Sequence, residues 1–278
     1  MRQQRIEDKF ADYNFLYKAV FADLLDRLDD LSHTFDQVGC LNLRDANCLQ
    51  ELRAHPKVGN VINVRPYGSI LTDLVGDAEA FPLQNLDMVF SCLDLHTLND
   101  VPGTLLQLRK ALKPDGLLVA GLFGGETLSQ LHHSLATAEQ DVLGGVSPRV
   151  SPFGSAQDFS MLLQRAGFAL PVVDAYPLTA EYDTLFDLIK DLRGMGETNA
   201  VALRSKKASP RQLFMKSAEI YQDQYGKDGR IPATFEIISF TAWAPAATQQ
   251  QPLRPGSAKM RLADALQAEE KSAGEKTG

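Results

Sequence analysis

The segment LDMVFSCL, residues 86–93, decides the fold of this chain. It is a nearly continuous apolar run, and LLVAGLF at residues 117–123 is a second one, as expected for strands buried on both faces of a parallel sheet. Between them, Pro102 marks the first turn of a helix that we expect to reach Leu112, followed by a turn at residues 113–116. This order of strand, helix and strand predicts an α/β fold.

The chain before this unit predicts three more strands and two helices. The strands are expected at Phe35–Leu41, at residues 60–64 and at Leu74–Val75, with a helix at residues 47–55. Earlier still, the segment 10–31 places a stripe of apolar residues on one side of a helix. The stripe consists of Phe10, Leu16, Val20, Phe21, Leu24, Leu25, Leu28 and Leu31. We expect this lead-in helix to cover the sheet.

The chain after residue 123 predicts the second half of the domain and a tail. Helices are expected at residues 126–143, 157–166, 184–192 and 210–225, and strands at residues 172–176, 178–182 and 234–243. We therefore divide the chain into a helical lead-in (1–33), an α/β domain (34–245) and a tail (246–278). The tail is rich in Ala, Gln, Pro, Lys and Glu, which predicts disorder.

Composition and charge exclude several classes of function. The 278 residues carry a formal net charge of −7 with a pI near 5.3, which disfavours a nucleic-acid binder because such a protein needs a basic face. No apolar run reaches the ~18 residues of a membrane-spanning helix. The first ten residues, MRQQRIEDKF, lack an apolar signal core and carry acidic residues early. We therefore expect a soluble cytoplasmic protein without a transit peptide.

The three cysteines, Cys40, Cys48 and Cys92, do not form a metal-binding pattern. They lack CxxC or Cys/His spacing, and their odd number predicts reduced thiols rather than disulfides. No His/His/carboxylate triad of the kind that holds oxygen-activating iron is recognisable either. We expect no metal site, and we interpret Cys40 and Cys92 as small buried apolar residues rather than nucleophiles.

Three ordered segments resemble the class I S-adenosylmethionine-dependent methyltransferases of the ubiquinone and biotin synthesis type. They are GDAEAFP (76–82), LDMVFSCLDLHTLND (86–100) and LRKALKPDGLLVAGLF (108–123). The resemblance implies a doubly wound, Rossmann-like sheet of seven strands, mostly parallel with an antiparallel last strand. It also implies S-adenosylmethionine as the cofactor.

A narrower likeness lies further along the chain. Five segments are similar to the assembly factor 5 family of NADH–ubiquinone oxidoreductase, or complex I: FGGETL (123–128), SPRVSPF (147–153), RAGF (165–168), DLRGMGETN (191–199) and PATFEI (232–237). The likeness covers residues 10–245. It implies a role in complex I assembly with a protein target, a subunit of respiratory complex I, and arginine hydroxylation as the proposed reaction.

The cofactor of this fold must be held at three places, and the sequence supplies only one of them clearly. Asp77, followed by Ala78, matches the residue that meets adenine. In the glycine-rich turn after the first strand, Cys40 stands in place of the acidic residue and Asn42 in place of the first glycine, while Gly39 comes too early. At the end of the second strand, Asn63 or Arg65 replaces the acidic residue that binds the ribose.

The missing carboxylate lowers the affinity that we expect for the cofactor. A hydrogen bond to a charged partner contributes about 1.5–3 kcal/mol, so its loss weakens cofactor binding by about one to two orders of magnitude. An arginine such as Arg65 can instead accommodate a phosphate in related nucleotide folds. The candidate cofactor residues are Gly39, Cys40, Leu41, Asn42, Asn63, Asp77, Ala78 and Ser91.

Asp94 and His96 are the candidate catalytic residues. They follow the strand at 86–93, at the edge of the sheet where open α/β folds bind ligands, and either can act as a general base or polarise an acceptor. A structural role is the alternative for both His96 and the turn-forming Asp77. The segments 151–153 and 194–197 are expected to shape the mouth of the substrate site, or to end helices.

Three functions remain open from the sequence. The first is a methyltransferase-fold protein of the complex I assembly factor 5 type that binds S-adenosylmethionine weakly or in altered form and acts on a protein. The second is a non-catalytic assembly or scaffold factor that has lost the cofactor. The third is a small-molecule methyltransferase of the biotin or quinone pathways, whose activity would be lost on His96→Ala.

Overall fold

The computed structural model describes residues 2–205 and 207–249. The described residues up to Pro245 form one compact unit, and residues 250–278 of the tail expected at 246–278 lie outside the described residues. The helices are α1 (Arg2–Ile6), the 3-10 helix η1 (Glu7–Asp12), α2 (Phe15–Asp29), α3 (Ala46–Ala54), the 3-10 helix η2 (Leu95–Thr97), α4 (Val101–Ala111), α5 (Ser129–Leu143), α6 (Ala156–Arg165), α7 (Leu185–Met195) and α8 (Arg211–Tyr225). The strands are β1 (Phe35–Leu41), β2 (Val58–Arg65), β3 (Leu74–Val75), β4 (Leu86–Cys92), β5 (Leu112–Phe123), β6 (Ala169–Tyr182) and β7 (Ile231–Trp243).

The seven strands form a single sheet in the order β3-β2-β1-β4-β5-β7-β6. The pairs from β3 to β5 are parallel, and β7 runs antiparallel to both β5 and β6. This confirms the expected mostly parallel, seven-stranded α/β sheet with an antiparallel last strand. The apolar run that predicted β4 is buried on both faces, with Met88 and Phe90 in one core cluster and Val89 in the other.

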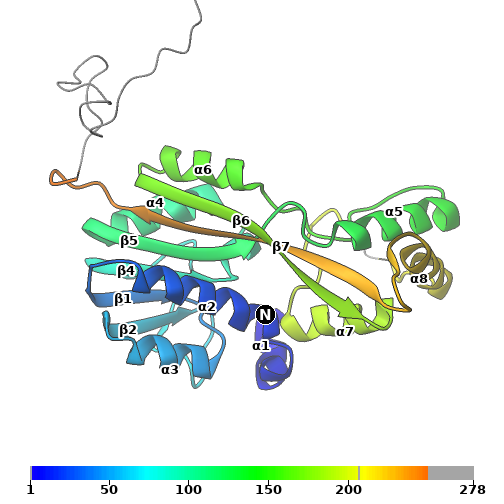
Figure 1. The fold of residues 1–278 in the computed structure, drawn as a ribbon, viewed down its shortest axis with the longest axis horizontal. Coiled ribbons are helices and arrows are strands. Elements are labelled where there is room, and N and C mark those ends of the chain that lie inside the picture. Colours follow the sequence, from blue (N-terminus) through cyan, green and yellow to red (C-terminus); the bar gives the residue numbers. More distant parts are fainter. Residues whose placement is uncertain (1, 206, 250–278) are drawn as a thin grey trace, which may run out of the picture. The chain divides into compact units, whose positions relative to one another are not determined.

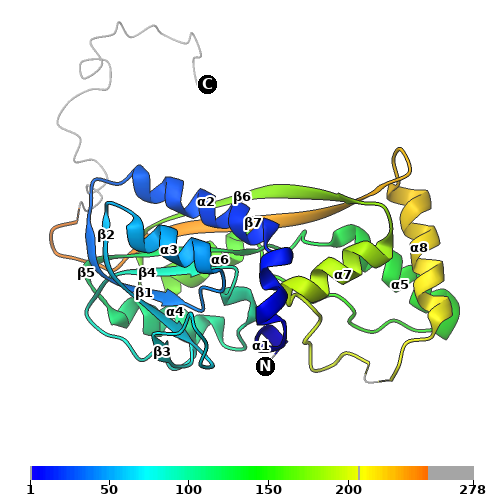
Figure 2. The same ribbon diagram turned by 90° about the horizontal axis from the view of Figure 1, so that it is seen from below.

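Helices cover both faces of the sheet (Figure 1). α2 and α3 pack against β4, β5 and β2 on one face, while α4 and α6 pack against β5 and β6 on the other. The long ends of β6 and β7 extend beyond the parallel strands, and α5, α7 and α8 gather around them (Figure 2). The molecule therefore has a sheet-and-helix half and a helical annex, and the carboxyl ends of the parallel strands lie between them.

The lead-in predicted at 10–31 is helical but interrupted. Its apolar stripe is buried as expected in α2, whereas Phe10 belongs to η1 and Asn14 lies at the break between the two. Asn14 donates a hydrogen bond to Asp45, the N-cap residue of α3. The break turns α1 and η1 away from α2 and toward α7, which they contact.

Two expected strand boundaries were wrong. The strands predicted at 172–176 and 178–182 are one continuous strand, β6, with Pro177 inside it. Proline is tolerated there because β6 is the edge strand of the sheet, so no neighbour on its outer side needs the missing N–H. The turn predicted at 113–116 is part of strand β5. The strand is irregular there, because Asp115 has a left-handed φ of 65° and the pairing register with β4 shifts.

Within the described residues, no helix is both long and apolar enough to span a membrane.

Candidate functional site

The carboxyl ends of β1, β2 and β4 meet at one edge of the sheet, as parallel strands require. They place Asn42, Arg65 and Asp94 close together, and α1 and η1 lie over the same place. This edge is where a doubly wound fold binds its ligands. Two cavities open beside it, a small one against β1 and β2 and a large one behind His96.

Asn42 occupies the turn after β1. Its φ of 47° is left-handed, which asparagine tolerates and which the glycine expected in this turn adopts freely. Its side-chain amide donates hydrogen bonds to Gln3 Oε1 and Asp94 Oδ1, both at 2.7 Å. The side chain therefore bridges the N-terminal helix and the end of β4, across the place that a cofactor turn would leave open.

Arg65 lies at the end of β2 and is fully buried. Its guanidinium donates to Glu7 Oε1 at 2.6 Å, to the Tyr67 hydroxyl at 2.6 Å and to Asn42 Oδ1 at 3.3 Å, and it stacks on the Tyr67 ring. Ser69 accepts a further bond. Because the donors of Arg65 are satisfied by the chain itself, the arrangement gives no support to the predicted phosphate-binding role.

Asn63 is also fully buried, and its side chain binds only backbone groups. Its Oδ1 accepts a bond from the Leu43 amide at 3.0 Å, and its Nδ2 donates to the carbonyls of Leu43 and Leu71 at 2.9 and 2.8 Å. The side chain fastens the loops after β1 and β2 to each other. It has no free group for a ribose.

The cavity at this edge has a volume of about 90 Å³, and its walls include Gln3, Leu41, Asn42, Asp77 and Ala78. Sites for ligands of drug or cofactor size are usually about 300–1,000 Å³. S-adenosylmethionine therefore does not fit the residues as they stand, since Asn42 fills the turn and an arginine paired with Glu7 replaces the ribose carboxylate. No methyl-transfer step can be derived from this arrangement.

Asp77 and Ala78 do reach this cavity, but Asp77 also shapes its own turn by accepting the Glu79 amide at 2.9 Å. The other candidates of the cofactor set lie in the strands. Gly39 is in mid-strand, where an added Cβ would meet the Leu86 side chain at 2.7 Å. Cys40 and Ser91 are completely buried and line neither cavity. The structure thus brings Leu41, Asn42, Asp77 and Ala78 to the cleft and leaves the others beneath it.

Asp94 is buried at the centre of the edge. Burial raises the pKa of its carboxyl group, while the hydrogen bond from Asn42 and the charge of Arg44 act in the opposite direction. Arg44 lies over the rings of Phe10 and Tyr17 and donates to the Met195 carbonyl at 3.0 Å. Asp94 is therefore held by Asn42 in the turn after β1, beside the charge of Arg44, which is itself tied to the end of α7.

His96 faces the larger cavity. Its Nε2 lies 3.1 Å from Glu197 Oε2, and its ring packs against Phe123 and Phe153 at centroid distances of 4.8 and 5.6 Å. Glu197 also pairs with Arg44 at 3.4 Å. An ionised carboxylate can only accept, so the Nε2–H of His96 donates to Glu197, and in the neutral ring Nδ1 is the remaining acceptor. Nδ1 is buried and has no partner in the described part of the chain.

The larger cavity measures about 530 Å³. Its walls come from the start of α5, the loop before α6, α7, the loop after α7 and α8, and they combine apolar side chains with three arginines, Arg149, Arg193 and Arg204. The loop is held to α5 by Glu139, which accepts bonds from the Ser147 amide at 2.8 Å and from Arg149 at 2.6 Å. Burial acts to raise the pKa of Glu139, but these bonds outweigh it and lower the pKa. Of the predicted mouth segments, residues 151–153 and Glu197 line this cavity. Gly194 lines a neighbouring cavity next to the N-terminal segment.

Comparison with known proteins agrees with this architecture. Residues 32–120 match the family model described as a methyltransferase domain. The chain is 34% identical over 266 residues to a zebrafish (Danio rerio) protein named arginine-hydroxylase NDUFAF5, mitochondrial, which spans 91% of this chain and 83% of that protein. The chain belongs to the NDUFAF5 family. A Dictyostelium discoideum relative of the same name is 40% identical over 203 residues, 72% of this chain but only 46% of that protein.

A solved structure confirms the NDUFAF5-family chain as a class I methyltransferase fold. It is the phosphoethanolamine N-methyltransferase 2 of Haemonchus contortus in complex with S-adenosyl-L-methionine, with a TM-score of 0.52 at 14% identity. The match covers 86% of this chain and 57% of that protein. At this identity the likeness shows the fold alone.

Sequence reasoning missed the residues that close the edge and complete the His96 site. Glu7 reaches Arg65 from 58 positions away, and Glu197 reaches His96 from 101 positions away. Of these only Glu197 lay in a segment already singled out, at 194–197. Among residues 2–205 and 207–249, no group of three His, Cys, Asp or Glu side chains is placed to hold a metal ion.

Proposed function

We propose that this chain acts in the assembly of respiratory complex I by binding a protein target and taking one of its arginine side chains into the His96 cavity. The relatives' name, arginine-hydroxylase NDUFAF5, supplies the class of target. The observation that carries the proposal is the His96–Glu197 pair at the wall of a cavity of about 530 Å³.

The corner of that cavity at His96 suits a guanidinium group, although Arg149, Arg193 and Arg204 line the cavity elsewhere. In a neutral ring the unpartnered Nδ1 of His96 is an acceptor for an N–H donor, and the carboxylate of Glu197 supplies a negative charge beside it. The half-buried ring of Phe153, which also lines the cavity, offers a face on which a planar guanidinium stacks. In this role His96 and Glu197 bind and orient the target. Asp94, the other predicted catalytic residue, is placed to support the turn at Asn42.

The non-catalytic scaffold is the second candidate, and the closed cofactor cleft of about 90 Å³ favours it. A small-molecule methyltransferase needs the same cofactor and loses support for the same reason. The assembly factor that modifies an arginine and the non-catalytic scaffold remain as candidates. Both bind a protein target, and they differ in whether the arginine of the target is chemically altered. Cytoplasmic location stays a prediction, whereas the relatives are named as mitochondrial.

Deletion of the gene in its own host tests the proposal. We expect the deletion to lower the amount of assembled complex I on native gels, and the wild-type gene to restore it. His96→Ala should fail to restore it, while His132→Ala, an exposed histidine on α5, should restore it fully. Normal complex I in the deletion strain would refute the proposal.

Mass spectrometry of complex I subunits from the same strains separates the two candidates. An arginine that gains one oxygen atom or one methyl group only when the wild-type chain is present supports an enzyme. Restored complex I without any altered arginine supports the scaffold.

A further inference from the structure

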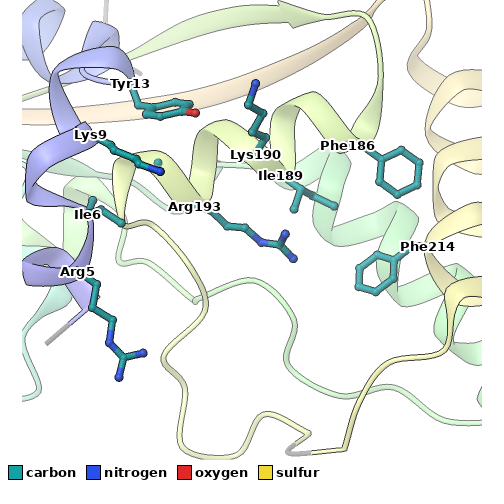
Figure 3. A pocket seen from close by; sticks show the side chains of 10 residues that line it. Arg5, Ile6, Lys9, Tyr13, Phe186, Ile189, Lys190, Arg193 and Phe214 are labelled. Carbon is teal, nitrogen blue, oxygen red and sulfur yellow. The ribbon is translucent and has the colours of Figure 1, made fainter.

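A third cavity adjoins the His96 cavity on the side of the N-terminal segment (Figure 3). Its volume is about 500 Å³. Residues from α1 and η1 form one wall, α7 forms the floor and Phe214 of α8 forms the far end. Ile189, Arg193 and Phe214 line both cavities, so the two cavities adjoin at these side chains.

The charge of this cavity is opposite to that of the whole chain. Arg5, Lys9, Lys190 and Arg193 line it, and no acidic residue does, although the chain carries a net charge of −7. Within the described residues none of the four forms an ion pair. A concave site lined by one sign of charge attracts ligands of the other sign.

The cavity is also divided into a cationic part and an apolar part. Figure 3 shows Lys9 of η1 and Arg193 of α7 reaching into the space, with Phe186 and Phe214 at the far end and Ile189 between them and Arg193. Phe186 is 47% exposed, so its ring is open to an apolar group of a ligand in the cavity. A ligand that fits must therefore carry negative charge and an apolar group side by side.

We infer that this cavity docks an acidic and apolar segment of the protein target, next to the arginine that enters the His96 cavity. The inference rests on the proposed function for the existence of a protein target. The shared wall of Ile189, Arg193 and Phe214 lets one continuous segment occupy both cavities. Aspartate or glutamate side chains meet Lys9 and Arg193, while a leucine or phenylalanine packs on Phe186 and Phe214.

Fluorescence anisotropy with the purified full chain tests the docking. The probe is a fluorescein-labelled peptide of alternating Asp and Leu residues, compared with peptides in which Asn replaces Asp or Ser replaces Leu. We expect saturable binding of the Asp–Leu peptide only, weakened by salt because the charges are exposed. Equal binding of the three peptides, or no saturable binding, would overturn the inference.

Variants locate the site. Lys9→Gln with Arg193→Gln should weaken binding of the Asp–Leu peptide by about tenfold, as expected for the loss of two exposed charge contacts. The control Lys110→Gln with Arg165→Gln removes the same charge from exposed positions on α4 and α6, and it should leave binding unchanged. Equal losses in both double variants would refute the assignment. A preference for anionic lipid vesicles that the peptide cannot displace would refute it as well.

His96→Ala keeps this experiment independent of the proposed function. His96 lines only the other of the two cavities, so His96→Ala should bind the Asp–Leu peptide normally while failing to restore complex I. Loss of peptide binding in this variant would show that the two cavities are not separate sites and would overturn the assignment.

Discussion

Asn42 stands in the one turn where this fold usually needs glycine, and its backbone has kept the left-handed angle that glycine adopts there. What has changed is the side chain, which spans from Gln3 to Asp94 and fills the space above the turn. The sequence predicted the replacement and the tolerated angle. It could not predict the bridge, because Gln3 lies 39 positions away and Asp94 52 positions away.

Asn42→Gly should reopen the turn. We expect the affinity for S-adenosylhomocysteine to rise by at least about tenfold, because the ligand no longer has to displace a hydrogen bond of the chain. Isothermal titration measures the change. Asn85→Gly is the control, since it makes the same substitution at another left-handed residue that is exposed and lines none of the three cavities. An unchanged affinity in Asn42→Gly would show that the side chain is not what closes the cleft.

The buried carboxylate of Asp94 makes a prediction about pH. Because burial raises its pKa in the folded chain, the folded state binds the proton more tightly than the unfolded state. Its contribution to stability therefore falls as the pH rises above the ordinary aspartate value of about 3.9. Asp94→Asn keeps an acceptor for Asn42 but cannot ionise. The free energy of unfolding of Asp94→Asn minus that of the wild type should therefore increase as the pH rises.

Urea unfolding at several pH values measures this difference. Comparing the two proteins at the same pH cancels the stability contributions of the other carboxylates. Glu139 is one of these, since its pKa is lowered and its contribution to stability is lost as the pH falls. A difference between Asp94→Asn and wild type that stays constant with pH would contradict the raised pKa.

At the scale of elements, the N-terminal segment does more than the sequence indicated. The apolar stripe predicted a helix that covers the sheet, and α2 does so. α1 and η1 were not foreseen as part of the site, because their polar residues Gln3 and Glu7 form no pattern along the chain. Only the fold places them over the ends of β1 and β2. Strand positions were easier to predict, because a strand that is buried on both faces consists of a nearly continuous run of apolar residues.

Contact between η1 and α7 depends on Gly194. A Cβ at Gly194 would lie only 2.2 Å from Cγ of Tyr13, so Gly194→Ala should push Tyr13 and the N-terminal segment away. Alanine is favoured over glycine inside a helix by about 1 kcal/mol, yet overpacking costs about 1–3 kcal/mol. We therefore expect a net loss of stability of about 1 kcal/mol in Gly194→Ala.

The double variant Tyr13→Ala with Gly194→Ala supplies the control. Removing the ring removes the clash, so adding Gly194→Ala to Tyr13→Ala should be neutral or stabilising in urea unfolding. If Gly194→Ala destabilises both backgrounds equally, α7 does not hold the N-terminal segment through this contact.

For the molecule as a whole, the family and the sheet followed from ordered segments of sequence. Two features did not follow, namely the closed cofactor cleft and the pair of cavities joined at Ile189, Arg193 and Phe214. Both depend on contacts between segments far apart in the sequence, which no local pattern records. Together they are the reason that we propose the space behind His96, and not the cofactor edge, as the site of action.

Titration of S-adenosylhomocysteine into the full chain, followed by calorimetry, tests this account most directly. Side chains of the chain itself occupy the cleft, so we expect no saturable binding at micromolar ligand concentration. A micromolar dissociation constant for the unaltered chain would contradict the account, because it would require the space that Asn42, Arg65 and Glu7 now fill.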